Sequence, residues 1–220
     1  MSRWRITGNQ FFMTGEFNAS GLVQLMGDFS GYVNIAAIRN NESWQGQQLI
    51  IASNWGSQTS VTETSWSHDG RIAITKTDPS PNLEEVHPID ADMLRDVTDP
   101  FSAMMTMLNR LDAGKSCSGV FQIYDGRRRA ELSFSDLGIV ELDPDRTFAF
   151  DGKTQLCGIV SLPLGGHRRK SRFSSRTPDP SKTRAYIARL ATGLLVPVRI
   201  EVDLFFGQIV TRLDMKRSVF

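Results

Sequence analysis

Alternation of apolar and polar residues runs through most of the chain and restricts it to a fold built mainly from β-strands. In segment 196–202, valine or isoleucine occupies every second position, and segments 129–135 and 71–76 alternate in the same way. This period is typical of a strand with one buried face. Because Pro197 has no N–H to donate, we expect its strand at a sheet edge, or with the proline nitrogen turned away from a partner. We predict strands over most of residues 4–76, 119–164 and 184–214.

Turn-forming dipeptides separate these alternating segments. Asp69-Gly70 and Asp125-Gly126 each lie between two such segments, and Asp-Gly is the strongest short-range signal for a β-hairpin. Asp151-Gly152 and Phe206-Gly207 are weaker signals of the same kind. The pattern therefore predicts a meander of antiparallel strands.

Residues 99–112 depart from the alternation and predict one amphipathic helix. Asp99 suits the N-cap and Pro100 the first helical position, while Gly114 suits the left-handed conformation that often follows a helix. Apolar residues recur at helical spacing: Phe101, Met104, Met105, Leu108 and Leu111. We expect this helix to cover the concave face of the sheet. Its methionines either pack in the core or line an adaptable ligand groove.

The chain of 220 residues can bury a substantial core. We predict a single domain over residues 1–220, with long loops at about 77–98 and 165–182. Lys and Arg number 25 against 24 Asp and Glu, so the overall charge gives no general attraction to nucleic acid. No segment approaches the roughly 18 consecutive apolar residues of a transmembrane helix.

The N-terminus and the cysteines bear on the compartment. Residues 6–10 are not the continuous apolar core that a signal peptide requires. We therefore expect either a cytoplasmic chain or one whose leader has been removed or truncated. Cys117 and Cys157 are the only cysteines, and they are either free core thiols or one disulfide. A disulfide closing this loop would stabilise the fold by roughly 4 kcal/mol and would imply an oxidising compartment.

The polar residues do not form a recognisable catalytic pattern. His68, His87 and His167 lie in predicted turns or loops without metal-ligand spacing, and we expect them to face solvent. Segment 114–116 resembles the end of a phosphate-binding loop, but Asn109 occupies the position where that motif requires glycine. We predict that the protein is not an enzyme and has no catalytic residue, cofactor or metal site.

Two basic clusters stand out locally. The first is either a solvated loop or a contact loop for phosphate, lipid headgroups or an acidic partner, and it consists of Arg168, Arg169, Lys170 and Arg172. The second is the arginine run at 127–129. Because neighbouring residues of a strand face opposite sides, we expect Arg128 to point inward and to need a carboxylate partner.

Several motifs, taken in order, resemble the bacterial family called domain of unknown function 3108, and its alphaproteobacterial branch in particular. These motifs are residues 99–103, Cys117, residues 120–121 and 125–129, Cys157, and residues 163–168 and 195–200. The resemblance extends over about residues 22–213. It implies a periplasmic protein with a Cys117–Cys157 disulfide. It also implies a strongly curved antiparallel sheet or half-open barrel, loosely similar to lipoprotein-carrier folds.

We consider two functions for such a protein. The first is a non-enzymatic periplasmic envelope protein that binds an apolar or lipid-like ligand in the concavity. Its wall would carry Phe101, Met104, Met105 and Leu108, with the basic contact loop near its rim. The alternative is a protein-interaction module for envelope assembly or integrity, without a small-molecule ligand, that docks through an exposed strand edge or the basic loop.

Overall fold

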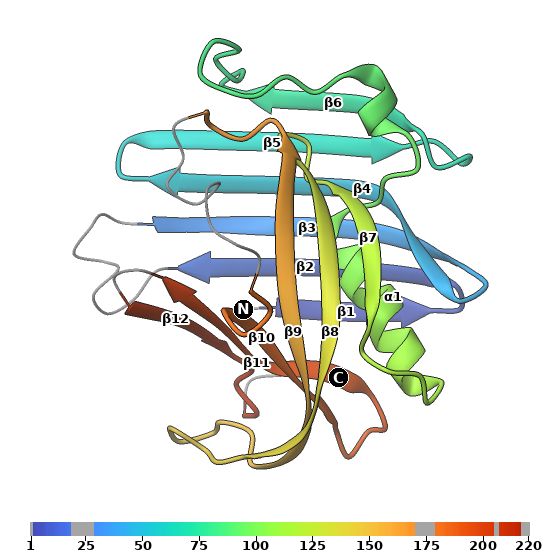
Figure 1. Ribbon diagram of the computed structural model, residues 1–220, viewed down its shortest axis with the longest axis vertical. Helices are drawn as coiled ribbons and strands as arrows, with labels where there is room; N and C mark the ends of the chain where they lie inside the picture. Colours follow the sequence, from blue (N-terminus) through green and yellow to red (C-terminus); the bar gives the residue numbers. More distant parts are fainter. Residues whose placement is uncertain (1, 19–28, 170–178, 205–206, 217–220) are drawn as a thin grey trace.

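The computed structural model describes residues 2–18, 29–169, 179–204 and 207–216, and within them the chain forms two six-stranded antiparallel sheets (Figure 1). The first sheet contains β1 (Ser2–Thr7), β2 (Gln10–Asn18), β3 (Phe29–Asn40), β4 (Ser43–Trp55), β5 (Gln58–Trp66) and β6 (Ile72–Asp78). The second contains β7 (Gly119–Tyr124), β8 (Arg129–Leu142), β9 (Gly152–Gly165), β10 (Thr183–Arg189), β11 (Leu195–Leu204) and β12 (Gly207–Arg212). Within each sheet every strand pairs with its neighbour in sequence, which confirms the predicted meander.

The turn signals fall at junctions between paired strands. Asp69-Gly70 connects β5 to β6, and Asp125-Gly126 connects β7 to β8, where Tyr124 pairs with Arg129. Of the two weaker signals, Asp151-Gly152 lies at the start of β9, and Gly207 begins β12, whereas Phe206 lies outside the described residues. The local prediction of hairpins is therefore confirmed at both Asp-Gly turns.

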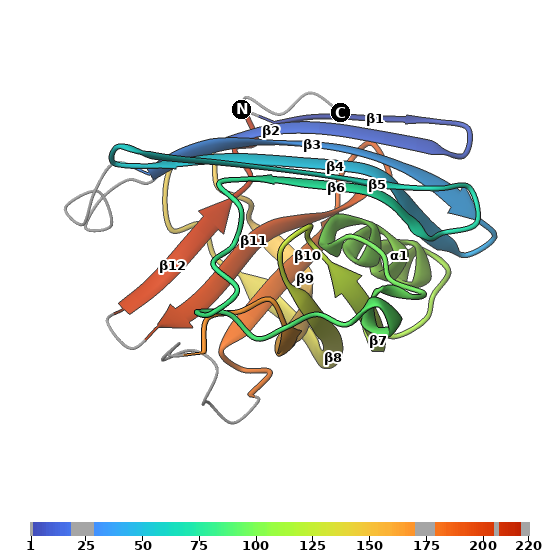
Figure 2. The same ribbon diagram turned by 90° about the horizontal axis from the view of Figure 1, so that it is seen from above.

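The two sheets form layers, and the strands of one cross those of the other (Figure 1). Between the layers lies α1 (Pro100–Asp112), which contacts β4, β7 and β11 (Figure 2). In the described residues each sheet keeps two edge strands, so neither closes into a barrel. The predicted mainly β, half-open fold with one amphipathic helix is confirmed.

The main hydrophobic core lies between the sheets and includes side chains from all three layers. Leu49 of the first sheet, Met107 of α1 and Ile187 of the second sheet are each almost completely buried in it. Burial of this apolar surface is the dominant favourable term in folding. Because α1 contributes to the same core as both sheets, the helix is part of the packed interior.

The structure shows that the first of the two alternatives for Pro197, an edge strand, is wrong. Pro197 lies in β11, which is flanked by β10 and β12, so its strand is not at a sheet edge. The pairing with β10 is irregular at this point, because the register shifts between Tyr186 and Ile187. A proline is compatible with an interior strand where a bulge interrupts the ladder.

The N-terminus of α1 is fixed by a buried carboxylate. Oδ1 of Asp99 accepts hydrogen bonds from the backbone N–H groups of Phe101 and Ser102, each at 2.9 Å. Oδ2 accepts from the Ser102 hydroxyl at 2.5 Å. Asp99 is fully buried, and desolvation raises the pKa of its carboxyl above the ordinary value. Asp99 is therefore the N-cap of α1, as predicted, and its side chain is buried in the protein interior.

A bulge in the β3–β4 pairing positions α1 on the first sheet. The register shifts between Ala36 and Ala37, opposite the start of β4. In this region the backbone N–H of Trp44 donates to Thr106 Oγ1 at 2.8 Å, and that of Gly46 donates to Thr98 Oγ1 at 3.2 Å. These two N–H groups of the irregular strand β4 thus find acceptors on α1 and on the segment that precedes α1.

Candidate functional site

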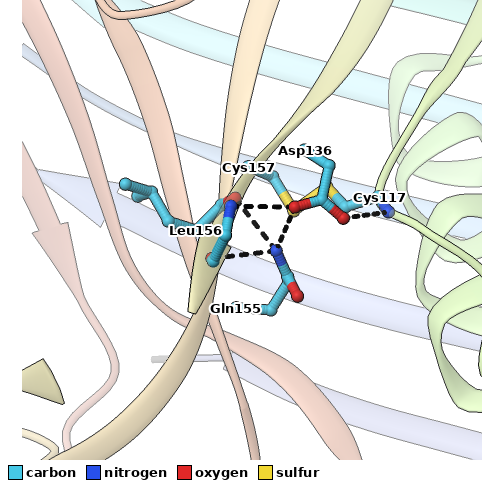
Figure 3. Close-up of a disulfide and its surroundings, with 6 residues drawn as sticks. Cys117, Asp136, Gln155, Leu156 and Cys157 are labelled. Atoms are coloured by element: carbon cyan, nitrogen blue, oxygen red, sulfur yellow. Dashed lines mark hydrogen bonds between the residues drawn. A yellow bond between two sulfur atoms is a disulfide. The ribbon is translucent and has the colours of Figure 1, made fainter. Parts of the chain in front are cut away.

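A disulfide joins the segment after α1 to the second sheet (Figure 3). Cys117 and Cys157 are both fully buried in the main core, and their Cα atoms are 6.0 Å apart. Asp136 lies beside the bridge, where its Oδ2 accepts from the Cys117 N–H at 3.2 Å and its Oδ1 accepts from Gln155 Nε2 at 2.8 Å. Of the two sequence-based alternatives for the cysteines, the structure shows the one that the family resemblance implied.

The four predicted ligand-facing residues of α1 fall into two groups. Phe101 and Met104 are half-buried and pack against the main core. Met105 and Leu108 are buried, and both also line a cavity of about 170 Å³ at the C-terminal end of the helix. The structure therefore brings two of the four to a cavity wall.

The remaining walls of this apolar cavity come from β1, the β3–β4 hairpin and the β10–β11 hairpin. Its other lining residues are Trp4, Ile6, Arg39, Trp44, Asn109, Asp112, Gly193, Leu194 and Leu195. Ile6 and Leu194 are 45% and 36% exposed and lie where the cavity meets solvent. Apolar walls with a few polar groups at the rim are typical of small-molecule sites.

A second, larger cavity of about 770 Å³ lies at the opposite margin of the first sheet, near β5 and β6. We call it the arginine cavity. It is lined by Gln58, Thr59, Ser60, Pro79, Ser80, Pro81, Asn82, Glu85, Val86, Arg127, Arg128, Gly166, His167 and Arg168. Two of the motifs that carry the family resemblance, residues 125–129 and 163–168, meet at this cavity.

The β7–β8 turn is held tightly against β5, which positions Arg127 and Arg128. Gly126 has a φ of +89°, and a Cβ there would overlap the side chains of Thr62 and Thr64. Asp125 Oδ1 accepts from the backbone N–H groups of Arg127 at 3.0 Å and Arg128 at 2.7 Å. Only glycine combines this backbone conformation with so close an approach.

The structure corrects the predicted orientation in the arginine run. The Arg128 side chain is 66% exposed and pairs with Asp125 at 2.9 Å, so it does not point inward. Arg129 is the buried residue, and its Nε donates to Met93 O at 2.7 Å. The alternation fails because a register shift between Arg129 and Ala130 places both residues in buried positions.

Arg129 is satisfied by neutral groups. Besides Met93 O, its guanidinium donates to the carbonyl oxygens of Ile123 and Ala130 and to the side-chain oxygen of Gln122. Burial lowers the pKa of Arg129 below its ordinary value. Met93 belongs to the short 3-10 helix Ala91–Leu94, so Arg129 ties the loop before α1 to the second sheet.

The described parts of the two predicted long loops are paired by backbone hydrogen bonds. The N–H of His87 donates to His167 O at 2.9 Å, the N–H of Gly166 donates to His87 O at 2.8 Å, and the N–H of Arg169 donates to Glu85 O at 2.8 Å. A Cβ on Gly166, whose φ is +74°, would overlap the carbonyl oxygen of Arg127. This pairing brings the 165–169 segment against the β7–β8 turn.

The expectation that all three histidines face solvent is wrong for two of them. His68 is exposed as expected, but His87 and His167 are half-buried, and their rings stack with centroids 4.5 Å apart. Of the predicted basic contact loop, Arg168 and Arg169 are exposed, and Arg168 lines the arginine cavity. Lys170 and Arg172 lie outside the described residues.

Neither α1 nor any other helix in the described part of the chain is long and apolar enough to span a membrane. The described residues also contain no group of three or more histidine, cysteine, aspartate or glutamate side chains arranged to hold a metal ion.

Within the described residues the chain is a mainly β protein, in which two crossed antiparallel sheets enclose α1 and a disulfide joins the segment after α1 to the second sheet. The family model described as "Protein of unknown function (DUF3108)" matches residues 2–214, and the chain belongs to this family. No curated protein matches the sequence. The crystal structure of a beta-barrel-like protein of domain of unknown function DUF1849 from Brucella abortus is similar, with a TM-score of 0.44 and 8% sequence identity. The match covers 94% of this chain and 89% of that one.

Proposed function

We propose that this protein is a non-enzymatic, periplasmic protein of the bacterial envelope that binds an apolar, lipid-like ligand. The observation that carries the proposal is the apolar cavity at the C-terminal end of α1. Met105 and Leu108 form its inner wall, and the partly exposed Ile6 and Leu194 form its mouth. A ligand entering there would remove apolar surface of both protein and ligand from water.

The size of the cavity restricts the ligand. Its volume of about 170 Å³ is close to that of an engineered protein cavity of about 150 Å³ that takes up benzene. It is smaller than the roughly 300 Å³ at which pockets for drug-sized molecules begin. We infer that the cavity takes the end of an acyl chain, while the rest of the ligand lies along Ile6 and Leu194.

The disulfide supports the proposed compartment. Disulfides persist in oxidising compartments such as the bacterial periplasm and are rare in the cytosol. Cys117 and Cys157 are both fully buried and joined. A periplasmic location would place the apolar cavity in the aqueous space between two membranes, where a lipid-like molecule requires a protected site.

Binding of the apolar fluorophore N-phenyl-1-naphthylamine, with displacement by a fatty acid, tests the proposal. Leu194→Asp places a charge at the mouth and should weaken binding at least about tenfold, because an unpaired carboxylate resists desolvation. Leu162→Asp is the matched control, since Leu162 is 42% exposed and lies in β9 away from the cavity. Equal binding by wild type and Leu194→Asp would contradict the proposal.

An open sheet edge supports the alternative of a protein-interaction module. β1 is at one end of the first sheet and pairs only with β2 in the described residues. An unpaired edge can accept an added strand from a partner. Chemical cross-linking in the envelope that joins β1 to another protein, together with no fluorophore binding, would favour this alternative.

A further inference from the structure

The arginine cavity has an excess of positive charge on its walls. Arg127, Arg128 and Arg168 line it, and Glu85 is its single carboxylate among the described residues. Arg128 is already paired with Asp125, and Glu85 Oε1 accepts from Asn82 Nδ2 at 3.2 Å. Arg127 and Arg168 have no ion-pair partner in the described part of the chain. Two of the three arginines that line the cavity therefore have no carboxylate partner among the described residues.

Arg127 retains hydrogen-bonding capacity. Its Nη1 donates to Ser60 Oγ at 3.1 Å, and its Nη2 donates to Pro79 O. Its Nε is buried without an acceptor. A guanidinium has five N–H donors, so these two bonds to neutral oxygens leave further donors on the two Nη atoms. The bonds also fix the guanidinium in place between β5 and the segment after β6, which preorganises it for a ligand.

The rest of the wall matches a hydroxyl-rich molecule. Residues with hydroxyl or amide side chains also line the cavity: Gln58, Thr59, Ser60, Ser80 and Asn82. The volume of about 770 Å³ lies within the range of about 300–1,000 Å³ that is usual for small-molecule sites. The walls thus combine strong donors for an anion with neutral groups that can both donate and accept.

We propose that the arginine cavity binds a phosphate ester of a hydroxyl-rich molecule, with Arg127 and Arg168 contacting the phosphate. Two guanidinium groups suit a doubly charged phosphate better than a single carboxylate, because each can donate two parallel hydrogen bonds to its oxygens. The same phosphate monoester occurs in a soluble sugar phosphate and in a lipid whose sugar or polyol headgroup is itself phosphorylated. This site is independent of the apolar cavity, because the two share no lining residue.

Isothermal titration calorimetry of the oxidised, full-length chain tests the site with glucose 6-phosphate, inorganic phosphate and uncharged glucose. We expect glucose 6-phosphate to bind and glucose not to bind. Arg127→Gln and Arg168→Gln should each weaken binding about tenfold or more, as the loss of a charged hydrogen bond does. Arg169→Gln removes the same charge from the next residue, which does not line the cavity, and should leave binding unchanged.

Vesicles distinguish the two sources of the phosphate. If the natural ligand is a lipid headgroup, the protein should co-float with phosphatidylcholine vesicles that contain phosphatidylinositol 4-phosphate, whose inositol carries a phosphate monoester, and not with pure phosphatidylcholine vesicles. Arg168→Gln should abolish the difference. Arg168 is exposed, so this variant decides the result even if Arg127→Gln fails to fold. Absence of binding to all phosphate probes, or equal loss in Arg169→Gln, would overturn the proposal.

Discussion

The two cavities at opposite margins of the first sheet differ in how they are built. The apolar cavity is lined mainly by strands, hairpins and α1, with Met105 and Leu108 as extensions of the main core. The arginine cavity is lined mainly by turns and loops, at residues 79–86 and 166–168 and at the β7–β8 turn. Regular elements thus leave a small apolar space, whereas the loops build a larger polar one. This is the usual division between a scaffold and the loops that it carries.

The difference implies that each cavity depends on its own anchoring residues, while both depend on the shared core. Asp99 fixes the N-terminus of the helix that carries Met105 and Leu108. Arg129 fixes the loop before α1 to the second sheet, next to the turn that carries Arg127. Variants at these positions should therefore separate the two cavities.

Loss of the disulfide is expected to have the largest effect and to act on both cavities. The cysteines are 40 positions apart, and removing the cross-link from a loop of this length costs about 4 kcal/mol of unfolding free energy on the chain-entropy estimate. Urea unfolding of Cys117→Ala/Cys157→Ala, compared with the oxidised wild type, measures this cost. A loss below about 1 kcal/mol would show that the bridge contributes little to the shared core.

Arg129→Met is expected to destabilise the fold by about 2–3 kcal/mol, because it removes the Arg129 donors from the buried Ala130 O and from the partly buried Met93 O. Phosphate-ester binding in the arginine cavity should weaken with it, while fluorophore binding in the apolar cavity should persist. Arg128→Met is the control, since an exposed ion pair contributes only about 0–1 kcal/mol. Equal destabilisation by the two variants would contradict the different roles of the neighbouring arginines.

Asp99→Ala is expected to cost about 1–2 kcal/mol through loss of the N-cap. Loosening of α1 should weaken fluorophore binding and leave binding of glucose 6-phosphate unchanged, which is the reverse of the Arg129→Met result. Thermal unfolding and the two binding assays measure these effects. Loss of both activities in proportion would show that the cavities are not separately anchored.

The pH dependence of Asp99 gives the last prediction, which concerns the direction of an effect. Burial raises the pKa of its carboxyl in the folded state above the ordinary value. The folded protein therefore binds more protons here than the unfolded chain, and the contribution of Asp99 to stability falls as pH rises from about 4 to its raised pKa. Asp99→Asn keeps an acceptor for the cap but does not titrate.

Urea unfolding of wild type and Asp99→Asn between about pH 3 and pH 8 tests this sign. The free energy of unfolding of Asp99→Asn relative to wild type should increase with pH over that window and then level off. A relative stability that decreases with rising pH would show that the carboxylate is stabilised in its charged form.

Local signals predicted the elements better than their assembly. Residues 99–112 form the predicted helix because Asp99, Pro100 and Gly114 act within a few positions of the backbone that they cap. The Asp-Gly turns are local in the same sense. Alternation indicates which face of a strand is buried but not which sheet the strand joins. The division of the described strands into two layers therefore could not be predicted from the sequence.

The arginine cavity was missed for a related reason. It depends on the pairing of His87 with His167, eighty positions away in the chain, and on bulges that shift the alternation. Because the bulge after Arg129 interrupts the alternation, the buried residue is Arg129 and not Arg128 as expected. One usable signal existed, because residues 125–129 and 163–168 both belong to the motifs that resemble the family and both reach the cavity.

Native mass spectrometry of the protein purified from its own bacterial envelope, without harsh detergent, tests the proposed lipid-binding function most directly. We expect additional mass that organic solvent releases and that is identified as a lipid, and Leu194→Asp protein should carry less of it than Leu162→Asp protein. A mass equal to that of the polypeptide, less two protons for the disulfide, would contradict lipid binding.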